Sequence, residues 1–179
     1  MDKLIEKEVT AHTLYSGKII NLRVDDVSLP NGNGAIREYV EHRGGAAVLP
    51  IDNHGNAYLV KQFRYPYREL LLEIPAGKLE EGEPPITTAI RELKEETGFT
   101  GNVTPCGVLY PTPGYTNEKL YIFIATDLRK GDVCPDEDEF IEVVKVPMTE
   151  LIEWVTEGKI KDAKTAYAVL RYAYTSKKG

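Results

Sequence analysis

One segment near the middle of the chain constrains the fold more than any other, because proline and glycine fix where its helix begins and ends. Pro84-Pro85 suits a first turn, which needs no amide donor, and Gly98 suits the position just beyond the last turn. The predicted helix is residues 85–97. At about 100° per residue, its apolar side chains gather on one side and its glutamates on another. The first set is Ile86, Ala89, Ile90 and Leu93, and the second is Glu92, Glu95 and Glu96. We therefore expect one packing face and one carboxylate face.

The glutamate cluster is unfavourable by the ordinary rules for helices. Like charges four residues apart, as at Glu92 and Glu96, cost a few tenths of a kcal/mol. Acids in the final turn also oppose the helix dipole, at about 0.3–1 kcal/mol each. A solvated acidic face is the usual interpretation of such a run. A divalent cation that prefers hard oxygen ligands, Mg²⁺ or Mn²⁺, would offset the repulsion and give the cluster a purpose.

The first 44 residues predict a small antiparallel sheet. Asn31-Gly32-Asn33-Gly34 is typical of a tight hairpin, with residues 19–29 and 35–42 as its strands. A change of apolar phase near Asp25-Asp26 predicts a bulge there. A sheet this thin is not stable alone, so it must pack on the rest of the chain or on a second subunit.

Beyond Gly44-Gly45 short apolar strands and helical stretches follow one another irregularly. Strands are expected at 46–51, 57–63, 70–74, 103–110, 120–125 and 141–146, and further helical spacing at 151–155 and 163–174. Without regular βαβ alternation, the pattern favours an α+β fold, a mixed sheet between helices, over a doubly wound one. At about 150 residues per domain, 179 residues make one main domain with an appendage.

Charge and composition exclude several classes of protein. The chain has 22 Lys+Arg against 28 Asp+Glu, a net charge of −6, which argues against general nucleic-acid binding. The two cysteines, Cys106 and Cys134, indicate reduced thiols. The charged N-terminus is unlike a signal peptide, and no run approaches 18 apolar residues. We predict a cytoplasmic protein without a membrane partner.

Fixed spacings around the helix carry a family resemblance. Gly77, then five residues, Glu83, then seven residues and the run 91–99 (Arg-Glu-Leu-Lys-Glu-Glu-Thr-Gly-Phe) match every position of the Nudix box. Seven fixed positions at about 7% usage each arise by chance on the order of once in 10⁸ starts. The chain resembles a Nudix hydrolase, which implies a loop–helix–loop inside an α/β/α sandwich and hydrolysis of a nucleoside diphosphate linked to another group.

The resemblance also assigns roles to residues of the box. Glu92 and Glu96 would be the principal metal ligands, with Glu95 sharing a metal or a water. The carbonyl of Ala76, just before the box, is a further ligand in relatives, and Arg91 orients the glutamates. Glu83 and Gly77 have a structural interpretation: they hold the loop, the glycine by permitting its turn.

Three segments outside the box are similar to the ADP-ribose pyrophosphatases. These are Val60–Tyr65, Leu72–Gly77 and Tyr110–Tyr115, where Pro113 lies near the position of that subfamily's marker proline. The resemblance covers nearly the whole chain and implies Mg²⁺-dependent hydrolysis of ADP-ribose to AMP and ribose 5-phosphate. It implies residues 1–44 as a dimerisation sheet that swaps across a homodimer, and 45–179 as the hydrolase domain. The alternatives are another nucleotide sugar or dinucleotide as substrate, or a nucleotide-sensing module without turnover.

The remaining candidates contact substrate or water. Arg43 and Arg64 lie at strand ends, where a guanidinium fork suits phosphate, although a surface arginine is usually only a solubilising charge. Arg64 matches a substrate-binding arginine of the subfamily. Glu73, in an apolar strand, should face the metal or pair with an arginine, because an unpaired buried carboxylate is costly. In the acidic run 134–140 the subfamily register makes Glu137 or Glu139 the catalytic base and a metal ligand, with Glu137 preferred as base.

Overall fold

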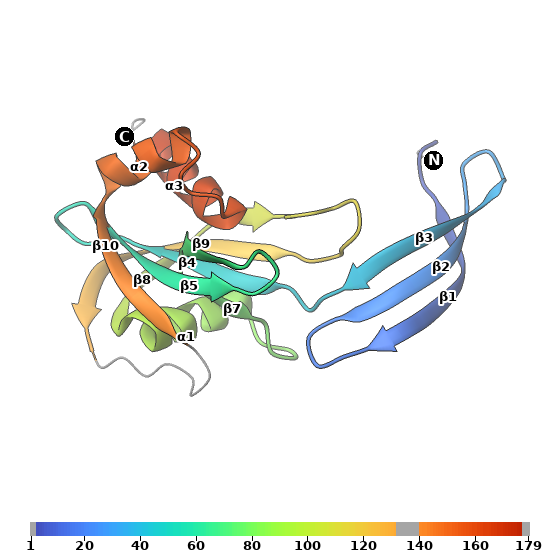
Figure 1. Cartoon of the computed structure of the whole chain (residues 1–179), viewed down its shortest axis with the longest axis horizontal. Helices are drawn as coiled ribbons and strands as arrows, with labels where there is room; N and C mark the ends of the chain where they lie inside the picture. Colours follow the sequence, from blue (N-terminus) through green and yellow to red (C-terminus); the bar gives the residue numbers. More distant parts are fainter. Residues whose placement is uncertain (1–2, 132–139, 177–179) are drawn as a thin grey trace. The chain divides into compact units, whose positions relative to one another are not determined.

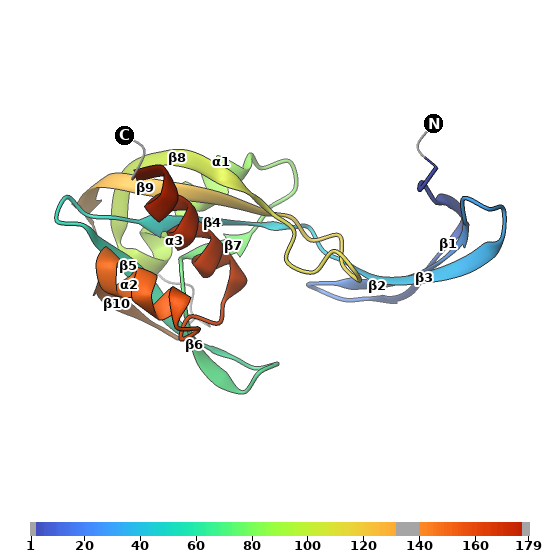
Figure 2. The same ribbon diagram turned by 90° about the horizontal axis from the view of Figure 1, so that it is seen from above.

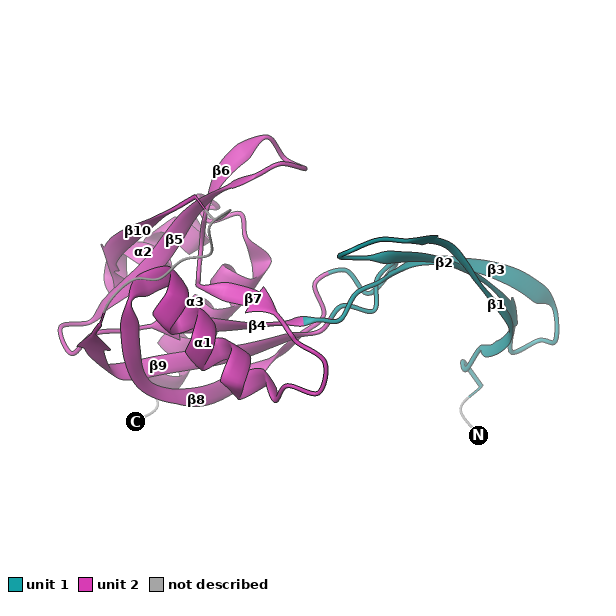
Figure 3. Ribbon diagram, turned by 90° about the horizontal axis from the view of Figure 1, so that it is seen from below, with its two compact units in different colours: residues 1–44, 112–118 teal, residues 45–111, 119–179 magenta. Residues whose placement is uncertain are grey.

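The computed structural model describes residues 3–131 and 140–176, which form two compact units. Unit 1 comprises Met1–Gly44 with Thr112–Glu118, and unit 2 comprises Gly45–Pro111 with Lys119–Gly179 (Figure 3). The second segment of unit 1 is thus inserted between two parts of unit 2. No helix in the described part of the chain is long and apolar enough to cross a membrane.

Unit 1 is a three-stranded antiparallel sheet. Its strands are β1 (Lys7–Ser16), β2 (Asn21–Ser28) and β3 (Gly34–Glu41), in the order β1-β2-β3. The predicted hairpin joins β2 to β3: Gly32 has a φ of 89°, and the Asn33 amide donates to Asn31 Oδ1 at 3.0 Å. Such short polar side chains and glycine supply the backbone conformations that the turn needs.

The bulge expected in β2 is wrong. Strand β2 pairs with β3 without interruption from Asn21 to Ser28, and the register shifts of the sheet lie on β1, between Glu8 and Thr10 and between Thr13 and Tyr15. The apolar phase changes for another reason. Asp25 is only 4% exposed and accepts a hydrogen bond from the His12 amide at 3.1 Å, so a polar side chain holds a buried position.

The segment Thr112–Glu118 is tied to β3. The Val40 amide donates to the Tyr115 carbonyl at 2.8 Å, and the His42 amide donates to Asn117 Oδ1 at 2.8 Å. These bonds explain why a stretch from the second half of the chain belongs to unit 1. The sequence did not predict this pairing.

The described residues of unit 2 form two sheets. One is mixed, in the order β7-β4-β9-β8, with β4 and β9 parallel and the other pairs antiparallel; the second is antiparallel, in the order β10-β5-β6. The hairpin of β5 and β6 stands out from the unit (Figure 2). The bounds are β4 (Gly45–Pro50), β5 (Asn56–Arg64), β6 (Glu69–Glu73), β7 (Ala76–Lys78), β8 (Phe99–Leu109), β9 (Leu120–Lys130) and β10 (Ile141–Pro147).

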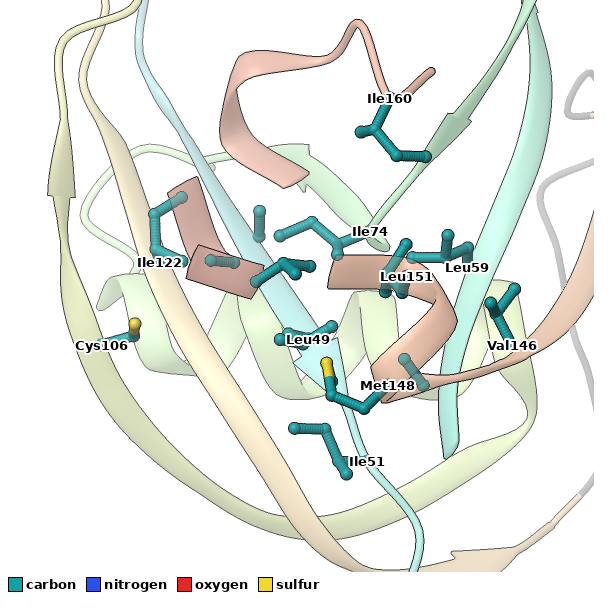
Figure 4. Packing of buried hydrophobic residues seen from close by; sticks show 14 residues of the cluster. Leu49, Ile51, Leu59, Ile74, Cys106, Ile122, Val146, Met148, Leu151 and Ile160 are labelled. Carbon is teal, nitrogen blue, oxygen red and sulfur yellow. The ribbon is translucent and has the colours of Figure 1, made fainter. Parts of the chain in front are cut away.

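In the described part of the chain, three helices cover the two faces of these sheets. Helix α1 (Pro85–Thr97) lies on one face, and α2 (Met148–Thr156) and α3 (Ala163–Ser176) lie on the other (Figure 1). Each face has its own apolar cluster. Leu49, Ile74 and Leu151 belong to the larger cluster, on the side of α2 and α3 (Figure 4), and Val48 and Leu93 to the smaller one, at α1. The predicted α+β sandwich with a mixed sheet is confirmed.

Candidate active site

Helix α1 has the predicted bounds and end residues. Pro85 stands in the first turn, and Gly98 ends the helix in the left-handed conformation with a φ of 70°, its amide donating to the Lys94 carbonyl at 2.8 Å. Glycine adopts this conformation without the steric cost that a Cβ would bring. The helix that carries the acids therefore has a fixed length and a fixed register.

The face that α1 buries is only partly the expected one: Ala89 and Leu93 are fully buried, as predicted, but the two isoleucines are not. Glu92 is 6% exposed and Glu96 is 3% exposed, whereas Ile86 and Ile90 are 37% and 47% exposed. The buried side is formed by Ala89 together with these two acids and neighbours on the same arc. Acidic side chains are normally exposed, and buried ones are rare unless they are paired or bind a cation. The carboxylates are therefore built into unit 2 rather than solvated.

Gly77 explains how a carboxylate fits beneath the helix. A Cβ at this position would lie 1.7 Å from Glu92 Oε1, so any other residue would occupy the place of the acid. The backbone of Gly77 is not in the left-handed region, unlike that of Gly82 and Gly98. The prediction that this glycine permits a turn is wrong. It allows Glu92 to approach the backbone of β7, next to Ala76.

Arg91 lies among the acids of α1. Its Nη1 donates to Glu92 Oε1 at 2.7 Å and to Glu95 Oε2 at 2.9 Å, and its Nε is 4.0 Å from Glu83 Oε1. Burial acts to lower the pKa of Arg91, but the charge of Glu92 and the hydrogen bond to Glu95 outweigh it, so the pKa is raised. The arginine stays charged and fixes the directions of two carboxylates, as its predicted orienting role requires.

Glu83 holds the loop that leads into α1. Its Oε2 accepts a hydrogen bond from Thr88 Oγ1 at 2.7 Å and from the Glu80 amide at 3.3 Å. The bond from Thr88 is the main reason that the pKa of Glu83 is lowered. These contacts agree with the structural interpretation of this residue.

Arg64 and Glu73 form a forked ion pair at the ends of β5 and β6. Arg64 Nε donates to Glu73 Oε1 at 2.6 Å, and Nη2 donates to Oε2 at 2.8 Å. Burial acts to raise the pKa of Glu73, but its hydrogen bond to Arg64 and the charge of Lys164 outweigh it and lower the pKa to about 2. Of the two outcomes expected for Glu73, pairing with an arginine is the one observed.

Lys164 and Asp162 complete this cluster, and the sequence did not single them out. Lys164 Nζ contacts Glu73 Oε2, and it also donates to Asp162 Oδ1 at 3.0 Å. Asp162 begins α3: its carbonyl accepts from the Ala166 amide at 3.0 Å, and its Oδ2 accepts from the Thr165 amide at 3.0 Å. A lysine in the first turn opposes the helix dipole, and that misplaced charge was the signal available in the sequence.

The two clusters lie within electrostatic reach of each other. The hydrogen bond to Glu73 is the main reason that the pKa of Arg64 is raised, and the negative charges of Asp162 and Glu96 add to the effect. The partly exposed Arg64 guanidinium is thus influenced by one of the acids of α1, Glu96. Among the other predicted site residues, Arg43 is exposed in unit 1, and Glu137 and Glu139 lie outside the described residues.

The acids of α1 fit a divalent cation. Within residues 3–131 and 140–176, no three His, Cys, Asp or Glu side chains are gathered as a complete metal cage. Mg²⁺ does not need one, because it keeps several waters and is held by one or two carboxylates together with substrate phosphates. Two buried carboxylates one helical turn apart, and the glycine that makes room for one of them, meet that requirement.

Comparison with known protein families shows which family this chain belongs to. The family model of the NUDIX domain matches residues 41–170. The model of the nucleoside diphosphate sugar hydrolase N-terminal domain matches residues 6–40. The chain belongs to the Nudix family. Nudix hydrolases generally use a divalent metal, which agrees with the donor set on α1.

Relatives of this Nudix protein cover almost its full length. It is 44% identical to the ADP-ribose pyrophosphatase of Bacillus subtilis (strain 168), over 94% of this chain and 93% of the relative. It is 40% identical to the methanol dehydrogenase activator of Bacillus methanolicus, over 94% of each. A crystal structure of an ADP compounds hydrolase superimposes with a TM-score of 0.83 at 22% identity, over 96% of this chain and 94% of that one, which confirms the Nudix fold.

Proposed function

We propose that the protein hydrolyses the pyrophosphate bond of ADP-ribose to AMP and ribose 5-phosphate. One observation carries the proposal: α1 buries the carboxylates of Glu92 and Glu96, and the charge of Glu96 acts on Arg64. Acids suited to a metal next to a fixed guanidinium are what a bridging diphosphate needs. The name of the Bacillus subtilis relative, at 44% identity, supports ADP-ribose as the substrate.

The metal in this proposal is Mg²⁺, with Mn²⁺ as a substitute. Glu92 and Glu96 would hold it, and Glu95 and the Ala76 carbonyl would be the further ligands suggested by the family pattern. When bound, such an ion neutralises phosphate charge and acidifies a water. Arg91 keeps Glu92 and Glu95 in place through its two hydrogen bonds. The general base stays a prediction from the sequence, Glu137 in preference to Glu139.

Arg64 is the proposed diphosphate contact. Among the described residues Arg64 donates hydrogen bonds from Nε and Nη2, both to Glu73, so the Nη1 edge remains for a phosphate oxygen. The Arg64 side chain is 39% exposed, whereas that of Glu73 is 3% exposed. The buried acid therefore positions the arginine, and the arginine meets the ligand. Arg43 is a second proposed phosphate contact, on the family pattern alone.

A substrate panel tests the proposal. We expect kcat/KM to be highest for ADP-ribose when it is compared with ADP-glucose, GDP-mannose and NADH, with AMP and ribose 5-phosphate as products. Turnover should need Mg²⁺ and stop in EDTA. A higher kcat/KM for another member of the panel would contradict the substrate, and unchanged turnover in EDTA would contradict the metal.

Another nucleotide sugar is the second candidate substrate. The match of residues 6–40 to the N-terminal domain of nucleoside diphosphate sugar hydrolases favours this wider class. A nucleotide-sensing module without turnover is the third candidate, and every acid of the Nudix box is present against it. Binding of ADP-ribose by calorimetry without product formation would favour the sensor.

We also propose that the enzyme is a cytoplasmic homodimer formed through unit 1. All ten residues of β1 are exposed, and large apolar side chains of this unit, such as Val9, Leu14 and Ile36, are 59–67% exposed. A second copy of the sheet would cover them about a two-fold axis. Sedimentation velocity should give twice the mass of the 20.1 kDa chain. A monomer at micromolar concentration would contradict the dimer.

A further inference from the structure

A buried row of charges links three elements of unit 2, and the proposed reaction uses only its outer member. In order of contact it consists of Arg64 on β5, Glu73 on β6, Lys164 on α3 and Asp162 just before α3, with Glu73 and Lys164 the most buried. The side chains of Glu73 and Lys164 are 3% and 10% exposed. Burying ionised groups is costly unless each is paired, so the row must be satisfied as a whole.

Glu73 joins the two cations. Its Oε2 accepts from Arg64 Nη2 at 2.8 Å and is also contacted by Lys164 Nζ, while its Oε1 accepts from Arg64 Nε at 2.6 Å. A carboxylate held by Arg64 alone could turn or shift together with the guanidinium. Lys164 approaches the same carboxylate from α3 and fixes it, so the plane of the fork is fixed as well.

Lys164 is too enclosed to meet a substrate. Its ammonium group is directed to Glu73 and Asp162, and its side chain is 10% exposed against 39% for Arg64. Its attachment of α3 to β6 is also duplicated, because Thr165 Oγ1 accepts a hydrogen bond from the Ile74 amide at 2.8 Å. A lysine in the first turn of a helix is unfavourable for the helix itself, so its value lies in the contact with Glu73.

We infer that Lys164 is a positioning residue, which acts through Glu73 to hold Arg64 in the orientation that binds the diphosphate. The inference deepens the proposed function and rests on it for the ligand. It assigns the start of α3, far from the Nudix box in sequence, to the substrate-binding apparatus.

A double-mutant cycle tests this role. Lys164→Met and Arg64→Met are made singly and together, and kcat and KM are measured for ADP-ribose with Mg²⁺. For Lys164→Met we expect KM to rise about tenfold with kcat within about threefold, since coupled neighbours interact by 0.5–3 kcal/mol. In the Arg64→Met background, the same change should alter KM less than about twofold, because the group it positions is gone.

The matched control is Lys161→Met. Lys161 lies three residues away and pairs with Glu69 at 2.6 Å, but both side chains are about half exposed or more, at 61% and 49%. Its loss should leave kcat and KM unchanged. If Lys164→Met does not fold, Lys164→Gln, which removes the charge but keeps an N–H donor for Glu73, takes its place in the cycle, with a smaller expected rise in KM that is again absent in the Arg64→Met background.

A second readout needs no substrate. The Arg64 Nε–H proton, bonded to Glu73, should exchange slowly with water in NMR spectra of the wild type and faster in the Lys164 variant. Equal effects of Lys164→Met in both Arg64 backgrounds, or an unchanged exchange rate, would overturn the inference. If the wild type does not hydrolyse ADP-ribose, the proposed function fails, and the exchange rate alone then decides whether Lys164 holds Arg64.

Discussion

Two clusters of buried carboxylates in unit 2 differ in what surrounds them. Glu73 is contacted by two cations, Arg64 and Lys164, and its pKa is lowered to about 2. Helix α1 instead carries three carboxylates, Glu92, Glu95 and Glu96, and Arg91 contacts the first two of them. The first cluster is balanced by the protein and positions an arginine. The second carries more negative than positive side-chain charge, which suits a cation from solution.

The largest expected effect is a loss of turnover when an acid of the α1 cluster is replaced. Glu96→Gln keeps the shape of the side chain and removes a charge from the cluster on α1. We expect kcat to fall about 10²–10³-fold, the range for loss of one preorganised electrostatic group, about 2.7–4 kcal/mol. Mg²⁺ affinity by calorimetry should fall with it. The exposed Glu81→Gln, in the loop before α1, serves as the control, and near-normal rates in Glu96→Gln would remove the acids of α1 from the site.

The second effect concerns folding and belongs to the other cluster. Glu73→Gln leaves Lys164 without its main buried partner, so the free energy of unfolding should fall by about 3 kcal/mol, near the low end for breaking a buried pair. The low end applies because Arg64 is partly exposed and Asp162 still contacts Lys164. Urea unfolding measures the change. Glu69→Gln, which breaks an exposed pair, should cost less than about 1 kcal/mol, and an equal loss in both variants would mean that burial does not matter.

The third effect concerns Arg64, which pairs with Glu73 of the first cluster and is influenced by Glu96 of the second. Arg64→Lys replaces a planar fork by a point charge, so it should not behave as a conservative change. Loss of one charge-assisted bond, about 1.5–3 kcal/mol, predicts a fall in kcat/KM of roughly 10–150-fold. If the contact is equal in ground and transition states, the fall appears as a raised KM. An unaffected variant would leave only the general Nudix chemistry, without a role for this arginine.

The fourth effect is the pH dependence of stability. The folded pKa of Glu73, about 2, lies below its ordinary value of 4.5, so the carboxylate stabilises the fold above pH 4.5 and loses this contribution as pH falls toward 2. The difference in unfolding free energy between the wild type and Glu73→Gln should therefore shrink over that interval. A constant difference between pH 5 and pH 3 would show that the pairing does not depend on the charge.

The smallest effect returns to α1 without metal. Removing one of the like charges on Glu92 and Glu96 relieves a repulsion of a few tenths of a kcal/mol. In EDTA the melting temperature of Glu96→Gln should therefore be equal to that of the wild type or slightly higher. A clearly lower value would mean that the acids of α1 stabilise the fold by themselves, and the contrast between the clusters would disappear.

Local signals predicted much of the fold. The proline pair and Gly98 act within one or two residues of the helix ends, so both bounds of α1 are confirmed. The predicted packing face of α1 was only partly correct. Ala89 and Leu93 are buried as expected, but Ile86 and Ile90 are not. Glu92 is buried instead, because Gly77, 15 residues before it in the chain, leaves space for its carboxylate. The Nudix box identified the glutamates of α1 but did not predict that two of them are buried.

The rest of the candidate site depends on contacts between distant segments. Glu73 and Lys164 are 91 residues apart, and neither charge alone distinguishes a buried pair from a solvated one. The pairing of Val40 with Tyr115 likewise joins a predicted strand to a distant segment in which the sequence shows no signal for that partner. Such contacts are set by the assembled sheets, which is why periodicity and spacing did not predict them.

The bonds between β3 and Thr112–Glu118 also determine how this chain can be cut and recombined. The backbone passes between the two units at three places: Gly44–Gly45, Pro111–Thr112 and Glu118–Lys119. A protease nick at the first junction would leave the N-terminal sheet hydrogen-bonded to a segment still anchored at both ends. Transplanting the sheet into another member of the family would require moving the 112–118 loop as well. Unit 1 therefore consists of two segments, residues 1–44 and 112–118, whose sequences must stay compatible with each other.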